Sequence, residues 1–183
     1  MMMRLFDKMT AEKIRDGDIL SFEKLITAYK DKIFNYCYRF CNHYHRAEEL
    51  SQEILIKVYQ NIGLYDWQKS SLSTWIYTIT HNICINSART STSETLYEEI
   101  NFENQTGTDG TEDKVLKEEL LDKLKAAILT LSPEERSLLI MKDYYGFKLK
   151  EISTIMNLPV GTLKSRLHTT RKKIRMMIGD LYD

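Results

Sequence analysis

Apolar residues recur every three or four positions along most of this chain, and no stretch alternates convincingly with the two-residue period of a strand. Between residues 19 and 40 this spacing predicts one face of a long helix, formed by Phe22, Leu25, Ile26, Tyr29, Ile33, Tyr36, Cys37 and Phe40. Shorter stretches with the same spacing follow, at residues 47–59, 72–83, 115–128 and 138–145. The spacing therefore predicts an all-α protein.

One segment, residues 87–111, breaks this pattern, because it is crowded with Ser, Thr, Asn and Gly and carries acidic side chains between them. Such a composition buries too little apolar surface to offset the entropy lost on ordering the chain. The sequence therefore predicts two small helical domains, at residues 1–89 and 113–183, joined by a flexible acidic linker at residues 90–112.

The formal net charge of zero, from 26 basic and 26 acidic side chains, hides an uneven distribution. Residues 1–95 carry 12 basic and 11 acidic side chains, and residues 96–132 carry 4 and 9. Residues 133–183 carry 10 and 6. The chain is thus nearly neutral in its N-terminal half, acidic in its middle and basic in its C-terminal part. This distribution predicts that different parts of the chain bind different partners.

Several classes of protein do not fit this sequence. It has no run of about 18 apolar residues, and its first residues lack the apolar core of a signal peptide, so we expect no membrane insertion. Its three cysteines are an odd number and predict no disulfide framework, which favours a cytoplasmic location. No Walker A, G-x-G-x-x-G or H-E-x-x-H motif occurs, so no cofactor and no catalytic residue are predicted.

The last two predicted helices, near residues 149–156 and 161–178, are separated by a turn at Asn157-Leu158-Pro159. This spacing is typical of a helix-turn-helix, whose second helix enters the major groove of DNA. The inward residues of the second helix follow at steps of three and four, at Leu163, Leu167, Thr170, Ile174 and Ile178. Its other face is basic, and Thr162 is a candidate cap that would place N–H groups near a phosphate. A surface helix with a solvated basic face is the alternative.

Region 4 of the extracytoplasmic-function (ECF) sigma factors, in the sigma-70 superfamily, has a signature that resembles Leu158-Pro159-Val160-Gly161-Thr162-Leu163-Lys164-Ser165-Arg166-Leu167. The start and middle of that region are similar to Leu131-Ser132-Pro133-Glu134-Glu135-Arg136 and Glu151-Ile152. The resemblance implies that the last helix reads the upstream (−35) promoter element through Lys164, Ser165, His168 and Thr169, with Arg171 near a phosphate. The residue pattern of the same helix adds Thr162 and Lys172 to the predicted DNA-binding face. Many members have Arg-Ala where this chain has Thr169-Thr170, which removes a possible guanine contact.

Region 2 of the same family has a helix that resembles Arg46-Ala47-Glu48-Glu49-Leu50-Ser51-Gln52-Glu53-Ile54. Leu50 and Ile54 are spaced to pack inward, which leaves the acidic and amide side chains largely exposed. The resemblance implies that this helix docks on the β′ clamp helices of core RNA polymerase through Glu48, Glu49, Gln52 and Glu53. On charge alone, a solvated helix side is the alternative.

The Trp-containing helix of the family's region 2 is similar to Leu72-Ser73-Thr74-Trp75-Ile76-Tyr77-Thr78-Ile79-Thr80-His81-Asn82, and residues 65–71 stand where the family has a base-capturing loop. Aromatic stacking, amides and hydroxyls can hold a base extruded during promoter melting. The implied contacts to the downstream (−10) element are Trp67, Gln68, Lys69, Ser70, Ser71, Asn82, Asn86 and Arg89. Trp75 shares the apolar face and is expected in the core. The family often has Arg at the position of Thr78, so we expect weaker phosphate attraction there.

Cys37, Cys41, His43 and His45 are close enough in sequence to be considered as metal ligands. Their spacing matches no common zinc pattern, so we expect buried thiols, two surface imidazoles and no metal. A redox or metal sensor that uses Cys37 and Cys41 is an alternative.

Together the resemblances imply a sigma factor that binds core RNA polymerase, directs it to specific promoters and helps to melt the −10 element. Such a protein is not an enzyme by itself. The family relation also implies an apolar surface on the second domain for the β-flap tip of the polymerase, and an anti-sigma factor that covers these surfaces. A stand-alone helix-turn-helix transcription regulator, which usually binds a two-fold site as a dimer, is the alternative.

Overall fold

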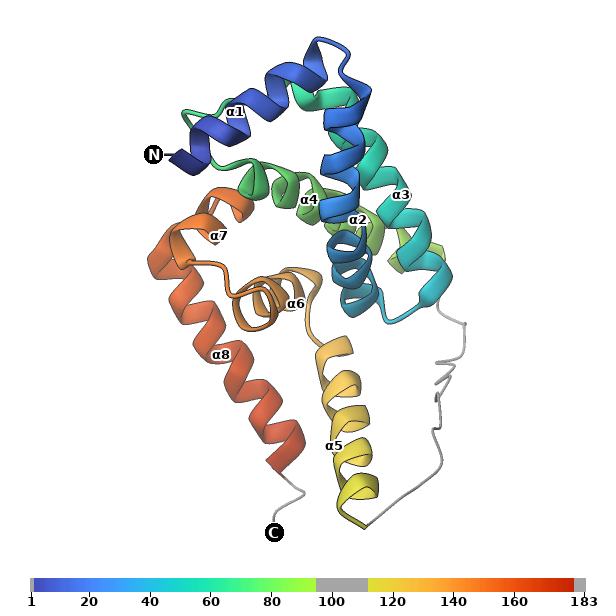
Figure 1. Cartoon of the computed structure of the whole chain (residues 1–183). Coiled ribbons are helices and arrows are strands. Elements are labelled where there is room, and N and C mark those ends of the chain that lie inside the picture. The colour runs from blue at the N-terminus through green and yellow to red at the C-terminus, as the bar shows by residue number, and fades with distance from the viewer. Residues whose placement is uncertain (1, 95–111, 180–183) are drawn as a thin grey trace.

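The computed structural model describes residues 2–94 and 112–179, which contain helices and no strands (Figure 1). In chain order the elements are α1 (Met2–Arg15), α2 (Ile19–Cys41), α3 (Tyr44–Asn61), the 3₁₀ turn η1 (Ile62–Leu64), α4 (Leu72–Glu94), α5 (Glu112–Leu129), α6 (Pro133–Leu139), the π-helical turn η2 (Ile140–Tyr144), α7 (Leu149–Met156) and α8 (Val160–Gly179). The predicted all-α fold is confirmed. Most of the predicted linker lies outside the described residues.

The N-terminal bundle consists of α1 to α4, in which α2 packs against α3 and both contact α4. At the start of α2, the Asp18 carboxylate accepts hydrogen bonds from the backbone N–H groups two and three residues on, at 3.1 and 3.3 Å. Asn42 ends α2 in the left-handed conformation, with a φ of 52°. The His43 ring then accepts from the Arg46 N–H at 3.1 Å and starts α3. These caps join α2 and α3 into a tight helical hairpin.

The C-terminal bundle consists of α5 to α8, with α8 packed against the other three helices. Ser132 and Glu135 form a reciprocal capping box at the start of α6: the Ser132 Oγ accepts from the Glu135 N–H at 3.3 Å, and the Glu135 carboxylate accepts from the Ser132 N–H at 3.1 Å. The π-helical turn η2 extends α6, and Gly146, with a φ of 70°, lets the chain leave it. Asn157 ends α7 in the left-handed conformation, which completes the predicted helix-turn-helix.

Two helix boundaries differ from those expected. α8 begins at Val160, so Thr162 lies inside its first turn and is not the helix cap. α4 continues to Glu94, so the predicted linker begins with five helical residues. The Thr90 hydroxyl at the start of this segment donates to the Asn86 carbonyl of the preceding turn at 3.0 Å.

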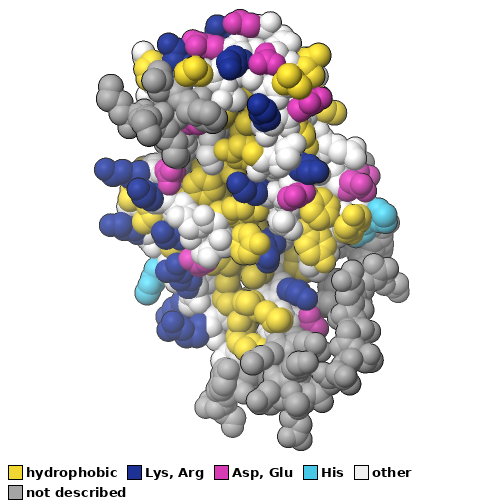
Figure 2. Space-filling model, viewed as in Figure 1, with side chains coloured by type: hydrophobic (Ala, Val, Ile, Leu, Met, Phe, Trp, Pro, Cys, Tyr) yellow, Lys and Arg dark blue, Asp and Glu magenta, His cyan; other side chains and the backbone are white. Residues whose placement is uncertain are grey.

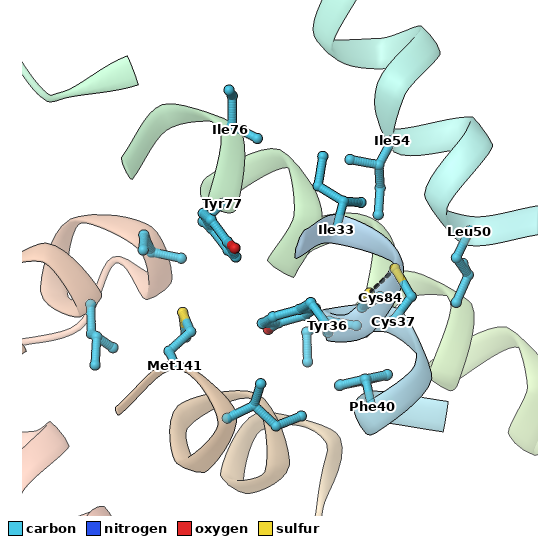
Figure 3. Close-up of a cluster of buried hydrophobic side chains, with 14 of the residues drawn as sticks. Ile33, Tyr36, Cys37, Phe40, Leu50, Ile54, Ile76, Tyr77, Cys84 and Met141 are labelled. Carbon is cyan, nitrogen blue, oxygen red and sulfur yellow. Dashed lines mark hydrogen bonds between the residues drawn. The ribbon is translucent and has the colours of Figure 1, made fainter. Parts of the chain in front are cut away.

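The two bundles share one hydrophobic core, a relation that the sequence did not predict. α4 packs against α6 and α7, and α2 packs against α6 and η2. Tyr36 of α2 is fully buried at this junction, between Ile33 of its own helix and Met141 of η2 (Figure 3). The stacked bundles place α3 and α8 on different sides of the molecule (Figure 1).

Within the ranges described above, none of the helices combines the length and apolar character that a membrane crossing requires.

Candidate nucleic-acid interface

One face of α8 is exposed and carries cations and hydroxyl groups. The opposite face is buried through Leu163, Leu167 and Thr170. Six of the seven side chains predicted to read DNA are exposed, namely Lys164, Ser165, His168, Thr169, Arg171 and Lys172, and Thr162 is partly buried in the first turn. Because an α-helix fits the major groove, this face has the dimensions and the polar groups to contact base edges and phosphates.

The hydroxyl groups of this face are held by their own helix. Ser165 Oγ donates to the Thr162 carbonyl at 2.9 Å, and Thr169 Oγ1 donates to the Ser165 carbonyl at 3.1 Å. Since each hydroxyl proton is used within the helix, the oxygen lone pairs remain as acceptors for a partner.

Arg171 is paired within the chain. Its Nε donates to Oδ2 of Asp143 in η2 at 3.1 Å, and a second guanidinium nitrogen donates to the other oxygen of the same carboxylate. This hydrogen bonding raises the pKa of the Arg171 guanidinium. The ion pair is exposed, so it stabilises the fold little and can exchange for a phosphate.

A basic hollow lies beside α8, and sequence reasoning placed only part of it. Besides the predicted cations it is lined by Arg175 at the end of α8 and by Lys142 of η2. The helical spacing of residues 161–178 already places Arg175 on the outward face of this helix. Lys142 carries no such signal, because only the fold of η2 brings it next to α8. Figure 2 shows Lys and Arg side chains gathered along this edge of the molecule.

Hydrogen bonds and an ion pair between nearby residues stabilise the loop between η1 and α4, residues 65–71. The Asp66 carboxylate accepts a hydrogen bond from the Gln68 N–H at 2.9 Å and lies 3.4 Å from Lys69 Nζ. Ser71 Oγ accepts from the Thr74 N–H at 3.1 Å, so Ser71 caps α4. The predicted loop residues are therefore adjacent and held in one conformation, with Gln68 and Lys69 exposed.

Trp67 in this loop is partly buried, and the Lys8 ammonium of α1 lies 5.3 Å from the centre of its ring. The other tryptophan, Trp75, packs against the core and against the Tyr65 ring at 5.7 Å, as expected for a structural residue. Of the two tryptophans, Trp75 therefore belongs to the core, whereas Trp67 lies outside the core cluster.

Asn82, Asn86 and Arg89 are exposed along one stripe of α4, at steps of four and three. They line a hollow whose other wall belongs to the C-terminal bundle. Across it, Arg89 pairs with Glu134 of α6 at 2.9 Å. This part of the predicted −10 site therefore faces the C-terminal bundle, whereas the Trp67 loop precedes α4.

The predicted docking residues on α3, Glu48, Glu49, Gln52 and Glu53, are all exposed. Glu49 pairs with Arg46 of the same helix at 3.0 Å. Sequence reasoning missed Ile56, which is 55% exposed and follows Gln52 and Glu53 by four and three positions. Ile56 is two positions after the buried Ile54 and therefore lies on a different face of the helix. This spacing is the sequence signal that could have identified Ile56 as an exposed apolar residue.

The cysteines and histidines do not gather into a metal site: among the described residues, no three His, Cys, Asp or Glu side chains are placed to hold an ion. The Sγ atoms of Cys37 and Cys84 lie 3.9 Å apart in the core (Figure 3). The partner of Cys37 is thus Cys84, whereas Cys41 is half-buried and its thiol donates to the His43 carbonyl. Hydrogen bonding to Cys37 and burial raise the pKa of Cys84, which disfavours a reactive thiolate.

The chain matches two family models. Residues 25–94 match Sigma-70 region 2, and residues 121–174 match Sigma-70, region 4. The first range contains α3, the Trp67 loop and α4, and the second contains the exposed face of α8.

Two curated relatives show how far the likeness extends. The ECF RNA polymerase sigma factor SigW of Bacillus subtilis is 32% identical over 98% of this chain and 100% of its own length. The RNA polymerase sigma-H factor of Pseudomonas aeruginosa is 27% identical over 92% of this chain and 91% of its own.

Two solved structures share the fold. The sigma factor RpoE of Bartonella quintana, in complex with the anti-sigma factor NepR, has a TM-score of 0.68 at 21% identity and covers 86% of this chain and 96% of its own. CnrH, in complex with the cytosolic domain of CnrY, has a TM-score of 0.71 at 13% identity over 96% of this chain and 98% of its own. The likeness to SigW along nearly the whole chain decides the family: this protein belongs to the ECF RNA polymerase sigma factors, which direct the polymerase to promoters.

Proposed function

We propose that three separate surfaces of this sigma factor bind the −35 element, the −10 element and the polymerase. The exposed face of α8 reads the −35 element, the Trp67 loop and the outer stripe of α4 recognise and melt the −10 element, and α3 docks on the β′ clamp helices. The observation that carries the proposal is the exposed, cation-rich face of α8 beside a basic hollow. Cations placed there neutralise DNA phosphates, and hydroxyl groups beside them meet base edges.

At the −10 element the proposal rests on Trp67 and the amides of α4. Gln68, Lys69 and Ser70 follow Trp67 in the same loop, so a base stacked on the indole would have an amide, a cation and a hydroxyl nearby. Stacking of this kind contributes roughly 1–3 kcal/mol per base. Ser71 also caps α4, so its substitution would change the fold of the loop as well as a DNA contact.

At the polymerase, the exposed acids of α3 precede the exposed, apolar Ile56 by one and two helical turns. An apolar centre with a charged rim is typical of protein interfaces, in which the charges speed and orient the encounter and the centre supplies most of the affinity. We therefore add Ile56 to the docking residues Glu48, Glu49, Gln52 and Glu53.

A groove between α5 and α8 supplies the apolar surface that the β-flap tip requires. Its apolar lining consists mainly of Leu124, Ile128, Leu129, Leu139, Ile140 and Ile174. Figure 2 shows hydrophobic side chains along the middle of the molecule, beside the cation-rich edge. RpoE was solved in complex with the anti-sigma factor NepR, and an anti-sigma factor is likewise the proposed inhibitor of this chain.

The polymerase, not the sigma factor, would perform the chemistry, in the bacterial cytoplasm. The test is a pull-down with bacterial core RNA polymerase, followed by run-off transcription on a genomic promoter library. We expect a stoichiometric complex that starts transcripts at a defined set of promoters. Specific binding to duplex DNA without polymerase binding would instead support a stand-alone regulator.

A further inference from the structure

The first helix of the chain, α1, precedes the residues that match Sigma-70 region 2, which begin at position 25. It nevertheless packs against α2, η1 and α4, and its Ala11 and Ile14 side chains are buried in the hydrophobic core. Asp7 precedes Ala11 by four positions and therefore lies on the same inward face, one turn nearer the N-terminus. Figure 1 shows this end of α1 beside the start of α4. The buried residues thus fix Asp7 and its neighbour Lys8 next to the Trp67 loop.

Asp7 caps α4 from a different helix. Its Oδ2 accepts a hydrogen bond at 3.0 Å from the N–H of Leu72, the first residue of α4. Ser71 accepts from the Thr74 N–H, so the Leu72 N–H needs a second acceptor, and Asp7 supplies it across 65 positions of sequence. The negative charge of Asp7 also suits the N-terminal end of a helix. The first turn of α4, where the Trp67 loop ends, is therefore held by α1.

Lys8, the next residue, contacts the indole of the loop. Its ammonium lies over the Trp67 ring, 5.3 Å from the ring centre, and 3.6 Å from the Glu12 carboxylate one turn further along α1. The Lys8 side chain is only 34% exposed, and a partly desolvated cation attracts an aromatic face and restricts the rotation of the ring. Two consecutive residues of α1 thus hold Trp67 and Leu72, five positions apart in the chain.

These contacts complete the order of the loop. Hydrogen bonds within the loop hold its backbone near Asp66 and Ser71, and α1 adds a contact to the indole itself. A site that is ordered before its ligand arrives binds more tightly, because the entropy of ordering its side chains is lost on folding and not on binding. The contacts from α1 therefore favour stacking of a base on Trp67.

We propose that α1 is a positioning element of the −10 site: Asp7 fixes the first turn of α4 and Lys8 orients the Trp67 indole, so that the stacking surface is formed before the promoter opens. The inference rests on the proposed base-capture role of Trp67. Asp7 and Lys8 act through Leu72 and Trp67 and not by touching DNA.

The first readout is taken on the free full-length chain. When the protein is labelled with 5-fluorotryptophan, its two tryptophans give two fluorine NMR signals, and Trp67→Phe assigns them. Lys8→Met, which removes the charge at similar length, is expected to shift the Trp67 signal and to leave the Trp75 signal in place. Lys13→Ala, at an exposed lysine of the same helix, is the matched control and should shift neither signal.

The second readout is the open complex formed by the polymerase holoenzyme on a promoter identified by run-off transcription, measured by permanganate reactivity. Lys8→Met is expected to lower the open-complex equilibrium constant about two- to fivefold, and Lys8→Arg, which keeps a cation, to restore most of the loss. Asp7→Ala is expected to lower it about fivefold. Asp7→Asn should stay within about twofold of the wild type, because its amide oxygen can accept the same bond.

A double-mutant cycle separates positioning from a direct DNA contact. In a Trp67→Ala background, Lys8→Met is expected to cause no further loss, because Lys8 acts through the indole. An equal loss in both backgrounds would show that Lys8 contacts DNA itself and would overturn the inference.

The inference is also wrong if Lys8→Met leaves the Trp67 signal in place, or if folded Lys8→Met and Asp7→Ala open promoters normally. Circular dichroism identifies any variant that loses helix, and if Asp7→Ala does so, the Lys8 variants decide. If Trp67→Ala itself opens promoters normally, the base-capture role fails, whereas a shifted Trp67 signal in Lys8→Met still establishes that α1 positions the loop.

Discussion

Nδ1 of His81 on α4 lies 2.6 Å from the hydroxyl of Ser137 on α6, in a buried site where the N-terminal and C-terminal bundles meet. The two residues are 56 positions apart in the chain and lie on either side of the acidic segment. This relationship connects α4, the helix proposed to contact the −10 element, to the bundle that contains α8, the proposed reader of the −35 element.

Acidification is expected to weaken the docking of the two bundles. Burial lowers the pKa of His81 to about 4 from its usual 6.5, so the docked form keeps a neutral imidazole. Above pH 6.5 the His81 imidazole is neutral whether the two bundles are docked or separated. Between pH 6.5 and about 4 only a form with separated bundles binds a proton, which favours separation up to tenfold, about 1.4 kcal/mol, per pH unit. Fluorescence energy transfer between dyes on α3 and α8 would measure this shift.

The control for this titration is His81→Gln, which removes the imidazole but keeps polar atoms beside Ser137. The other charged groups around the hollow that His81 lines are Arg89 of α4, Glu134 and Glu135 of α6, and Arg166 and Lys173 of α8. The contribution of these groups to the pH dependence is the same in His81→Gln as in the wild type. Equal pH profiles for the wild type and His81→Gln would show that His81 does not set the response.

Lys164→Ala is expected to weaken binding of duplex promoter DNA about uniformly across sequences. Loss of one phosphate contact reduces the slope of log K against log salt by about 1. Lys24→Ala, which removes an exposed lysine of α2 far along the chain from α8, is the control and should leave the slope unchanged. A salt titration by fluorescence anisotropy gives both slopes, and an unchanged slope for Lys164→Ala would remove it from the interface.

Asp143→Asn is expected to strengthen DNA binding. The Asp143 carboxylate pairs with Arg171 and lies beside the basic hollow, so its neutralisation frees the guanidinium and removes repulsion of phosphates. We expect a gain of a few-fold at low salt that diminishes as the salt concentration rises. If Asp143→Asn binds less tightly, the pair instead positions Arg171 for its DNA contact.

Ile56→Ala is expected to weaken polymerase binding more than Glu49→Ala does. A buried apolar anchor at an interface contributes about 1–2 kcal/mol, whereas a rim charge mainly changes the association rate. Glu23→Ala, an exposed acid on α2, is the matched control. Surface plasmon resonance separates the two rates, and wild-type affinity of Ile56→Ala would exclude Ile56 from the docking surface.

Trp67→Ala is expected to reduce the fraction of open promoter complex, with little effect on polymerase binding. Loss of one stacked base corresponds to roughly 1–3 kcal/mol, or about 5- to 150-fold in the open-complex equilibrium. Permanganate reactivity of the unpaired bases measures the opening. Leu64→Ala, at a 76% exposed residue near the loop, is the control and should open promoters normally. Normal opening by Trp67→Ala would reject the base-capture role.

Local sequence patterns determined the helices and the faces they expose. Asp18, Ser132 and Gly146 mark helix ends because capping bonds and a positive φ involve residues only a few positions apart. The three- and four-residue spacing also predicted which side of α8 is buried, since that side depends only on the helical repeat. The resemblance to ECF sigma factors extended these patterns to a function.

The tertiary structure alone decided how the two bundles meet. Tyr36 and Ser137 are 101 positions apart, and no periodicity relates residues across such a separation. The placement of Lys142 beside α8 and the pairing of Cys37 with Cys84 likewise depend on packing between helices that are distant in the chain. Helical spacing and caps act over a few residues, whereas the docking of helices depends on shape, burial and hydrogen bonds that form only when the whole chain has folded.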